Sequence, residues 1–90
     1  MNIGDIVISI NGRDAGKRFL VITVEDSYSQ IVNGKTRRLE KPKRKKHKHL
    51  KPEGKTDSLT IEKIKEKKLT NNETRKILAQ YERSAPDAER

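Results

Sequence analysis

The chain contains no cysteine and no tryptophan, and only three of its 90 residues are aromatic. Without cysteine, neither a disulfide nor a thiolate metal site can form, and the composition fits a reducing cytosolic setting. Hydrophobic residues make up 30% of the chain. No apolar run approaches the roughly 20 residues of a membrane-spanning helix, and residues 1–10 lack the basic start of a signal peptide. We therefore expect a soluble, cytoplasmic protein that makes no membrane contact.

Groups that could perform catalysis are also scarce. A chain this short buries a small core, which leaves little room for a deep catalytic cleft. Ser9 has no candidate general base beside it in the sequence. Residues 12–17 differ from a phosphate-binding loop, because three residues instead of four separate the glycines and Arg18 replaces the magnesium-binding Ser or Thr. We therefore predict that the protein is not an enzyme and uses no cofactor.

Positive charge is abundant, and one segment of the chain concentrates it. The net charge is +9, and residues 35–51 carry ten basic residues and a single acid, Glu40, whereas residues 1–34 have a net charge of −1. A concentrated positive field of this kind most often serves a polyanion. His47 and His49 lie in the same segment without a suitable third ligand nearby, so we predict no metal site.

Short apolar segments separated by turn residues fill the first fifty residues. The segment Arg18–Glu25 is apolar on both faces, which indicates a central strand. Asn33-Gly34 is a strong signal for a two-residue hairpin turn. Several short strands with tight turns predict a small β-barrel of about five strands, since closure removes exposed edges. The predicted strands are residues 5–10, 18–25, 28–32 and 35–39, with a short fifth strand near residues 49–50.

Residues 4–19 resemble a KOW motif. The matching features are Gly4 before the first strand, Ser9, the Gly-Arg-Asp-x-Gly-Lys sequence of residues 12–17, and Phe19 at the start of the next strand. The similarity continues through Arg37-Arg38, Lys41-Pro42-Lys43 and Lys45-Lys46 to His49-Leu50, and so covers roughly residues 1–51. The chain is similar to bacterial KOW-domain RNA-binding proteins that are related to large-subunit ribosomal proteins of the eukaryotic and archaeal type.

This resemblance implies an SH3-like barrel that presents its glycine-containing loop to RNA. The expected partner is ribosomal RNA of the large subunit, with ribosomal proteins as further partners, and the free protein is expected to be a monomer. Independently, Gly12 and Gly16 allow a tight turn and close approach to a ligand, although they could simply form a short connection. Arg13 can bind a phosphate with two hydrogen bonds, and Asp14 could orient its guanidinium group.

The few aromatic residues limit how RNA can be recognised. Base-stacking sheets need several exposed aromatic side chains, and we expect Phe19 in the core, whereas Tyr28 could belong to either the core or the surface. Recognition should therefore depend on phosphates, 2′-hydroxyls and shape. The predicted RNA-binding residues are Arg13, Lys17, Arg18, Lys35, Arg37, Arg38, Lys41, Lys43, Arg44, Lys45, Lys46, His47, Lys48, His49 and Lys51, with Gly12, Asp14 and Gly16 shaping the loop.

The periodicity changes after the basic segment. Apolar residues at helical spacing predict a helix of about three turns from Ser58, and Thr70 with Glu73 matches a capping box before a second helix that ends near Glu82. These helices could cover the barrel or pair with each other. The predicted organisation is a barrel at residues 1–51, a linker at 52–57, a helical tail at 58–83 and a flexible C-terminus at 84–90.

Two other functions remain open from the sequence. KOW-type barrels also occur in transcription elongation factors, where the barrel can dock on polymerase or another protein. In that case the helical tail would make the contact and the basic segment would be secondary. Sequence-independent binding of duplex DNA is the third possibility, because duplex DNA and RNA differ mainly in shape and in the 2′-hydroxyl group.

Overall fold

The computed structural model describes residues 1–84, and residues 85–90 of the predicted flexible C-terminus lie outside the described part of the chain. Ser84, which begins that predicted segment, is the last residue of a helix. No helix within the described residues is long and apolar enough to cross a membrane. The elements in chain order are β1 Asp5–Ser9, β2 Arg18–Val24, β3 Tyr28–Val32, β4 Lys43–Lys46, the 3-10 helix η1 His47–His49, β5 Leu50–Lys55, α1 Ser58–Lys65 and α2 Asn71–Ser84.

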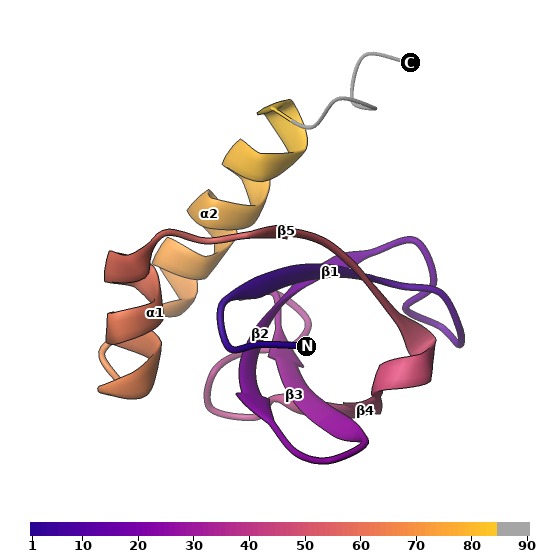
Figure 1. Ribbon diagram of the computed structural model, residues 1–90. Coiled ribbons are helices and arrows are strands. Elements are labelled where there is room, and N and C mark those ends of the chain that lie inside the picture. Colours follow the sequence, from indigo (N-terminus) through magenta and orange to yellow (C-terminus); the bar gives the residue numbers. More distant parts are fainter. Residues whose placement is uncertain (85–90) are drawn as a thin grey trace.

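The five strands form one antiparallel sheet in the order β4-β3-β2-β1-β5. β4 and β5 are the two edges of this open sheet, and η1 connects them along the chain. Figure 1 shows that the sheet is strongly curved, with both helices on one side of it. The figure also shows the β1–β2 loop and η1 at the end away from α1. The prediction of a small β fold followed by two helices is confirmed.

Each face of the sheet buries its own apolar cluster. The inner face holds Val7, Phe19, Val21, Ile31 and Leu50, all of them buried. Neighbouring residues point the other way because side chains alternate along a strand. The predicted coverage of β2 on both faces and the core position of Phe19 are therefore confirmed. The outer cluster consists of Ile6, Leu20 and Val32 from the sheet with Ile64 and Leu78 from the helices.

The two helices cover the outer face of the sheet and enlarge the core. Covering of the sheet was one of the two arrangements that the sequence left open. Asp57 caps α1 by accepting a hydrogen bond from the Thr60 amide at 2.8 Å. α1 has eight residues and is therefore about one turn shorter than predicted. The capping box of α2 is confirmed, because the Glu73 amide donates to Thr70 Oγ1 at 3.1 Å and the Thr70 amide donates to Glu73 Oε1 at 3.0 Å.

The predicted strand at residues 35–39, with its two-residue Asn33-Gly34 turn, is wrong. The Asn33 side chain accepts hydrogen bonds from the amides of Lys35 and Arg37, both at 2.9 Å, and so closes a loop. Arg75 of α2 donates to the Gly34 carbonyl at 2.6 Å. Gly34 has a φ of 79°, and a Cβ atom there would lie 2.5 Å from a carbonyl oxygen of α2. The loop is therefore fixed against α2, and the fourth strand begins later.

The predicted linker at residues 52–57 also needs correction, because β5 continues to Lys55. Pro52 and Gly54 suggested a break, but an edge strand tolerates proline since one side of it makes no ladder hydrogen bonds. Gly54 has a further role. A Cβ atom at this position would lie 2.6 Å from Cε1 of Tyr81, and the Tyr81 hydroxyl donates to the Glu53 carbonyl at 3.0 Å. α2 therefore packs directly on the backbone of β5.

Candidate nucleic-acid interface

The loop between β1 and β2 folds back on the strands that it connects. The Gly16 amide donates to the Ser9 carbonyl at 2.8 Å, and the Ser9 amide donates to the Lys17 carbonyl at 2.9 Å. Gly12 and Gly16 have φ values of 79° and 87°, a region that favours glycine. Ile10 donates its amide hydrogen to the His49 carbonyl at 2.9 Å, so the loop is joined to η1. We call residues 10–17 the glycine loop.

Lys45 of β4 points inward and anchors the glycine loop. Its ammonium group donates to Ser9 Oγ at 2.7 Å and to the Asn11 carbonyl at 2.8 Å, and the Ser9 hydroxyl donates to the same carbonyl at 3.1 Å. The residue is only 8% exposed. Burial lowers the pKa of Lys45 below its ordinary value, and the nearby charges of Lys43 and Arg37 also lower it, against the opposing effect of Asp14. Lys45 is therefore a structural cation, unavailable for a phosphate.

Asp14 pairs with Lys43 and does not orient Arg13 as predicted. Lys43 Nζ lies 3.2 Å from Asp14 Oδ2, and Asp14 is buried, whereas Arg13 is exposed. Burial alone would raise the pKa of Asp14. The ion pair with Lys43 and the nearby charges of Lys45 and Arg37 outweigh it, so the pKa lies below the ordinary value. Asp14 therefore stabilises β4 through Lys43, and Arg13 remains exposed to solvent.

The other two side chains of β4 point outward. Arg44 donates to Glu25, with NH2 at 3.0 Å from Oε1 and Nε at 3.2 Å from Oε2. The guanidinium carbon lies 3.8 Å from the centre of the Tyr28 ring, and Lys46 Nζ lies 6.0 Å from it. This stack of a cation on an aromatic ring was not predicted from the sequence. Tyr28, which was open between core and surface, is half-buried beneath these cations.

A groove separates the glycine loop from β4. Its volume is about 280 Å³, and its walls come from Asn11 and Gly12 of the loop, from Tyr28, from β4 and from His49. The cationic side chains of β4 thus lie across the groove from Gly12, which has no side chain to cover its backbone. The groove can accept a negatively charged or planar ligand at a surface where backbone and cationic groups lie close together.

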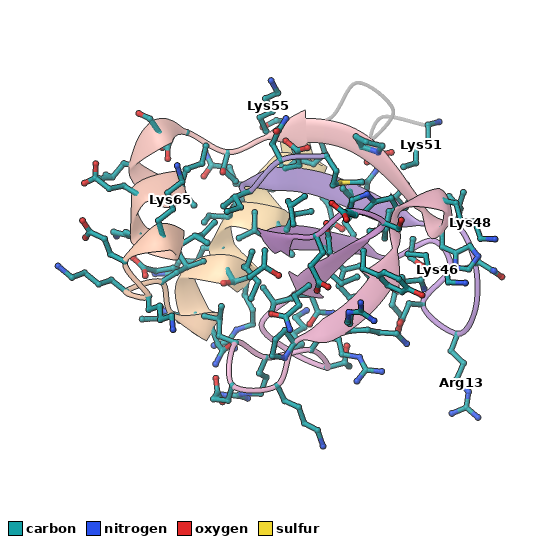
Figure 2. The ribbon with its side chains drawn as sticks, turned by 60° about the horizontal axis from the view of Figure 1, so that its bottom comes forward. Arg13, Lys46, Lys48, Lys51, Lys55 and Lys65 are labelled. Atoms are coloured by element: carbon teal, nitrogen blue, oxygen red, sulfur yellow. The ribbon has the colours of Figure 1, made fainter. Side chains whose placement is uncertain are left out.

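Beside this groove, four cations form what we call the cationic edge: Arg13, Lys46, Lys48 and Lys51. All four are exposed, and none of them forms an ion pair within residues 1–84. Figure 2 shows them along one end of the molecule, whereas Lys65 lies at the opposite end. Cations without acidic partners keep their charge available for a polyanion.

The remaining predicted site residues lie apart from this edge. Arg18 pairs with Glu53 at 2.6 Å and with Glu82 at 3.6 Å, so it joins β2 to β5 and α2. Lys17 and Lys35 line a separate hollow of about 350 Å³ beside α2. The loop between β3 and β4 carries Arg37, Lys41 and Arg38, and Arg38 lies 3.4 Å from Glu40.

The two histidines belong to η1. Nε2 of His47 lies 2.8 Å from Ser29 Oγ, which joins η1 to β3, and His49 lines the groove. Within the described part of the chain, no group of three or more His, Asp or Glu side chains is arranged to hold a metal ion. His47 therefore makes a structural contact with β3, and His49 lies in the wall of the groove.

A signal for the division of β4 is present in the sequence. Two-residue alternation sends Lys43 and Lys45 to one face and Arg44 and Lys46 to the other. This alternation could not identify Ser9 as the partner of Lys45, because 36 positions separate them.

No protein-family model matches the chain, and no curated protein matches it. The interface is therefore defined by the positions of its own side chains.

Proposed function

We propose that the protein is a non-catalytic RNA-binding protein that holds folded ribosomal RNA of the large subunit against the cationic edge and the adjacent groove. One observation carries this proposal. Lys46, Lys48 and Lys51 are exposed at one end of the molecule and have no acidic partner within residues 1–84, although 13 acidic residues are present in the chain. Unpaired cations on a rigid strand and a short helix can meet several phosphates together.

The proposal includes an SH3-like barrel of the KOW type. Three features support it: the strong curvature of the sheet, the pairing of β5 with β1, and the short η1 that joins the two edge strands. In such a barrel the glycine loop and η1 lie at one end, and a folded RNA would contact both. The helices stabilise the opposite side, where Ile64 and Leu78 pack on β1, β2 and β3.

Structured RNA fits this surface better than a single strand of defined sequence. Lysines are flexible point charges without a fixed donor geometry, so lysine contacts to phosphates favour shape over sequence. The described surface offers one partly exposed aromatic side chain, Tyr28, beside the cationic edge. A duplex with a loop or bulge would use both the phosphate contacts and this ring.

The test is co-sedimentation with large ribosomal subunits over a series of salt concentrations. Contacts to about four to six phosphates predict a slope of about −3 to −5 in a plot of log affinity against log salt. The variant K46Q/K48Q/K51Q should reduce this slope by about 2 to 3 and weaken binding about tenfold or more at moderate salt.

The matched control is K65Q/K67Q/K76Q, which removes three exposed lysines of the helical region without touching the cationic edge. It lowers the net charge by the same amount and should retain most of the binding. Equal losses in the two variants would show attraction by net charge alone and would contradict a defined interface. Competition between duplex DNA and structured RNA then distinguishes RNA recognition from binding of any duplex.

A second candidate function is that of a protein-interaction module, as in elongation factors that dock on polymerase. A hollow of about 480 Å³ between the sheet and α1, lined by Ile22, Leu39 and Leu69 among others, favours it. Leu59 of α1 is also 61% exposed. If K46Q/K48Q/K51Q stayed bound to the ribosomal fraction while L59S/L69S was released, this second function would replace the first.

A further inference from the structure

Tyr28 is placed where a flat ligand can reach the cations stacked on it. It begins β3 and pairs with Lys46 across the β3–β4 ladder, so the two side chains lie on the same face of the sheet. The guanidinium carbon of Arg44 is 3.8 Å from the ring centre, which is close contact between two flat groups. This stack forms part of the groove wall opposite Gly12.

The guanidinium group of Arg44 is held in position but remains accessible. Tyr28 covers one face, and the carboxylate of Glu25 accepts hydrogen bonds along one edge from Nε and NH2. The side chain of Arg44 is nevertheless 53% exposed. With one face and one edge occupied, the opposite face of the guanidinium plane is the side that remains for a flat ligand. A planar cation fixed in this way is already oriented for stacking.

We propose that this exposed face binds one unpaired RNA base, which would stack on Arg44 above Tyr28 while its flanking phosphates contact the cationic edge. The inference rests on the proposed RNA-binding function and names its substrate as a folded RNA with a bulged or looped-out nucleotide. Guanidinium planes and aromatic rings are the usual partners of splayed-out bases. A base stacked there has a second cation nearby for its flanking phosphates, since Lys46 lies two residues after Arg44 in the same strand and 6.0 Å from the centre of the Tyr28 ring.

The arrangement selects a base by its flat face, so it should tolerate any of the four bases. Stacking strength, and not hydrogen bonding to base edges, sets the preference. Glu25 contributes by holding the guanidinium plane before RNA arrives, which reduces the entropy lost on binding. A fully paired stem offers no free base to this stack and would bind through its phosphates alone.

The experiment compares two RNA hairpins that are identical except at one bulged position, which carries either a base or an abasic site. Both RNAs have the same length and charge, so phosphate contacts are matched. The wild-type protein should bind the hairpin with the base about 5- to 150-fold more tightly, the range expected for stacking of a single base. Direct titration at one fixed salt concentration measures the ratio.

Two substitutions separate stacking from charge. R44K keeps the charge but removes the planar group, so it should bind the abasic hairpin like the wild type and lose the preference for the base. K48Q, at an exposed position of η1, should weaken binding of both hairpins equally and preserve the ratio. Circular dichroism of R44K checks that the sheet is unchanged.

The outcomes distinguish this inference from the proposed function. Equal binding of the two hairpins by the wild type, or an unchanged ratio in R44K, would overturn the stacking site and leave phosphate-based RNA binding intact. Failure of the wild type to bind either hairpin at low salt would overturn both. A ratio that falls in R44K and also in Y28L, but not in K48Q, would establish the two-layer stack.

Discussion

The inward and outward side chains of the basic strand β4 have different surroundings. In β4, Lys43 and Lys45 point into the molecule, where they meet Asp14, Ser9 and the backbone of the glycine loop. Arg44 and Lys46 point outward beside Tyr28. The residue types are almost the same, but the partners differ completely. Strand alternation therefore divides one cationic run into a structural half and an exposed half.

The difference shows why a count of cations overstates a binding surface. A buried lysine must be compensated by hydrogen bonds and an acid, because burial opposes its charged form. Lys45 donates hydrogen bonds to Ser9 and Asn11, and the nearby charge of Asp14 favours its charged form. An exposed lysine needs no such partners and keeps its charge free. Within β4, only the exposed half offers side chains free to contact phosphates in the proposed interface.

The largest expected effect is that of removing the buried cation. Lys45→Met should lower the free energy of unfolding by about 2 to 4 kcal/mol, because Ser9, Asn11 and Asp14 lose a charged partner in a buried site. Urea denaturation measures the change. Lys46→Met is the matched control at the next position and should change stability by less than about 0.5 kcal/mol. Similar values for the two variants would remove the distinction between the two halves.

The ion pair of Asp14 and Lys43 should make part of this stability depend on pH. Asp14→Asn is expected to cost about 1 to 2 kcal/mol at pH 7. The pKa of Asp14 is lowered in the folded protein, so its contribution is complete above the ordinary value of 3.8 and is lost as pH falls through the folded-state pKa. Denaturation at pH 7 and below pH 3 should show the difference between wild type and variant shrinking. A constant difference would contradict the pairing.

Substitutions in the exposed half of β4 should change RNA binding and leave the free energy of unfolding nearly unchanged. Lys46→Met is expected to reduce the salt slope of RNA binding by about 1 and to weaken binding of all RNA sequences to a similar extent. The stability measurement described for this variant serves as its folding control. A binding loss that depends strongly on RNA sequence would assign Lys46 to base recognition and would sharpen the boundary of the stacking site.

The smallest expected effect comes from Glu25, which neutralises the outward Arg44. The hydrogen bonds from Arg44 lower the pKa of Glu25, so the carboxylate is charged at neutral pH. Glu25→Gln should strengthen binding to a fully paired RNA about two- to threefold, because it raises the net charge beside the groove by one. The thermal unfolding midpoint should not change, since the pair is exposed. Weaker binding to the paired RNA would contradict this expectation.

Local patterns predicted much of the fold because their physics is local. Apolar residues on both faces of β2 indicated a central strand, and Thr70 with Glu73 located the start of α2. The prediction failed at Asn33-Gly34, where the local preference for a hairpin was overridden. Arg75 and the first turn of α2 bind this loop from 41 positions away, which no window of neighbouring residues can indicate.

The sequence by itself determined where charge is concentrated, which residues can turn at positive φ, and which strands have two apolar faces. Each of these properties depends on a residue and its near neighbours. Only the tertiary structure decided that Lys45 is buried while Lys46 is free, and that Arg44 lies on Tyr28. Those outcomes depend on contacts such as that between Lys45 and Ser9, which form only when β4 meets the glycine loop across the curved sheet.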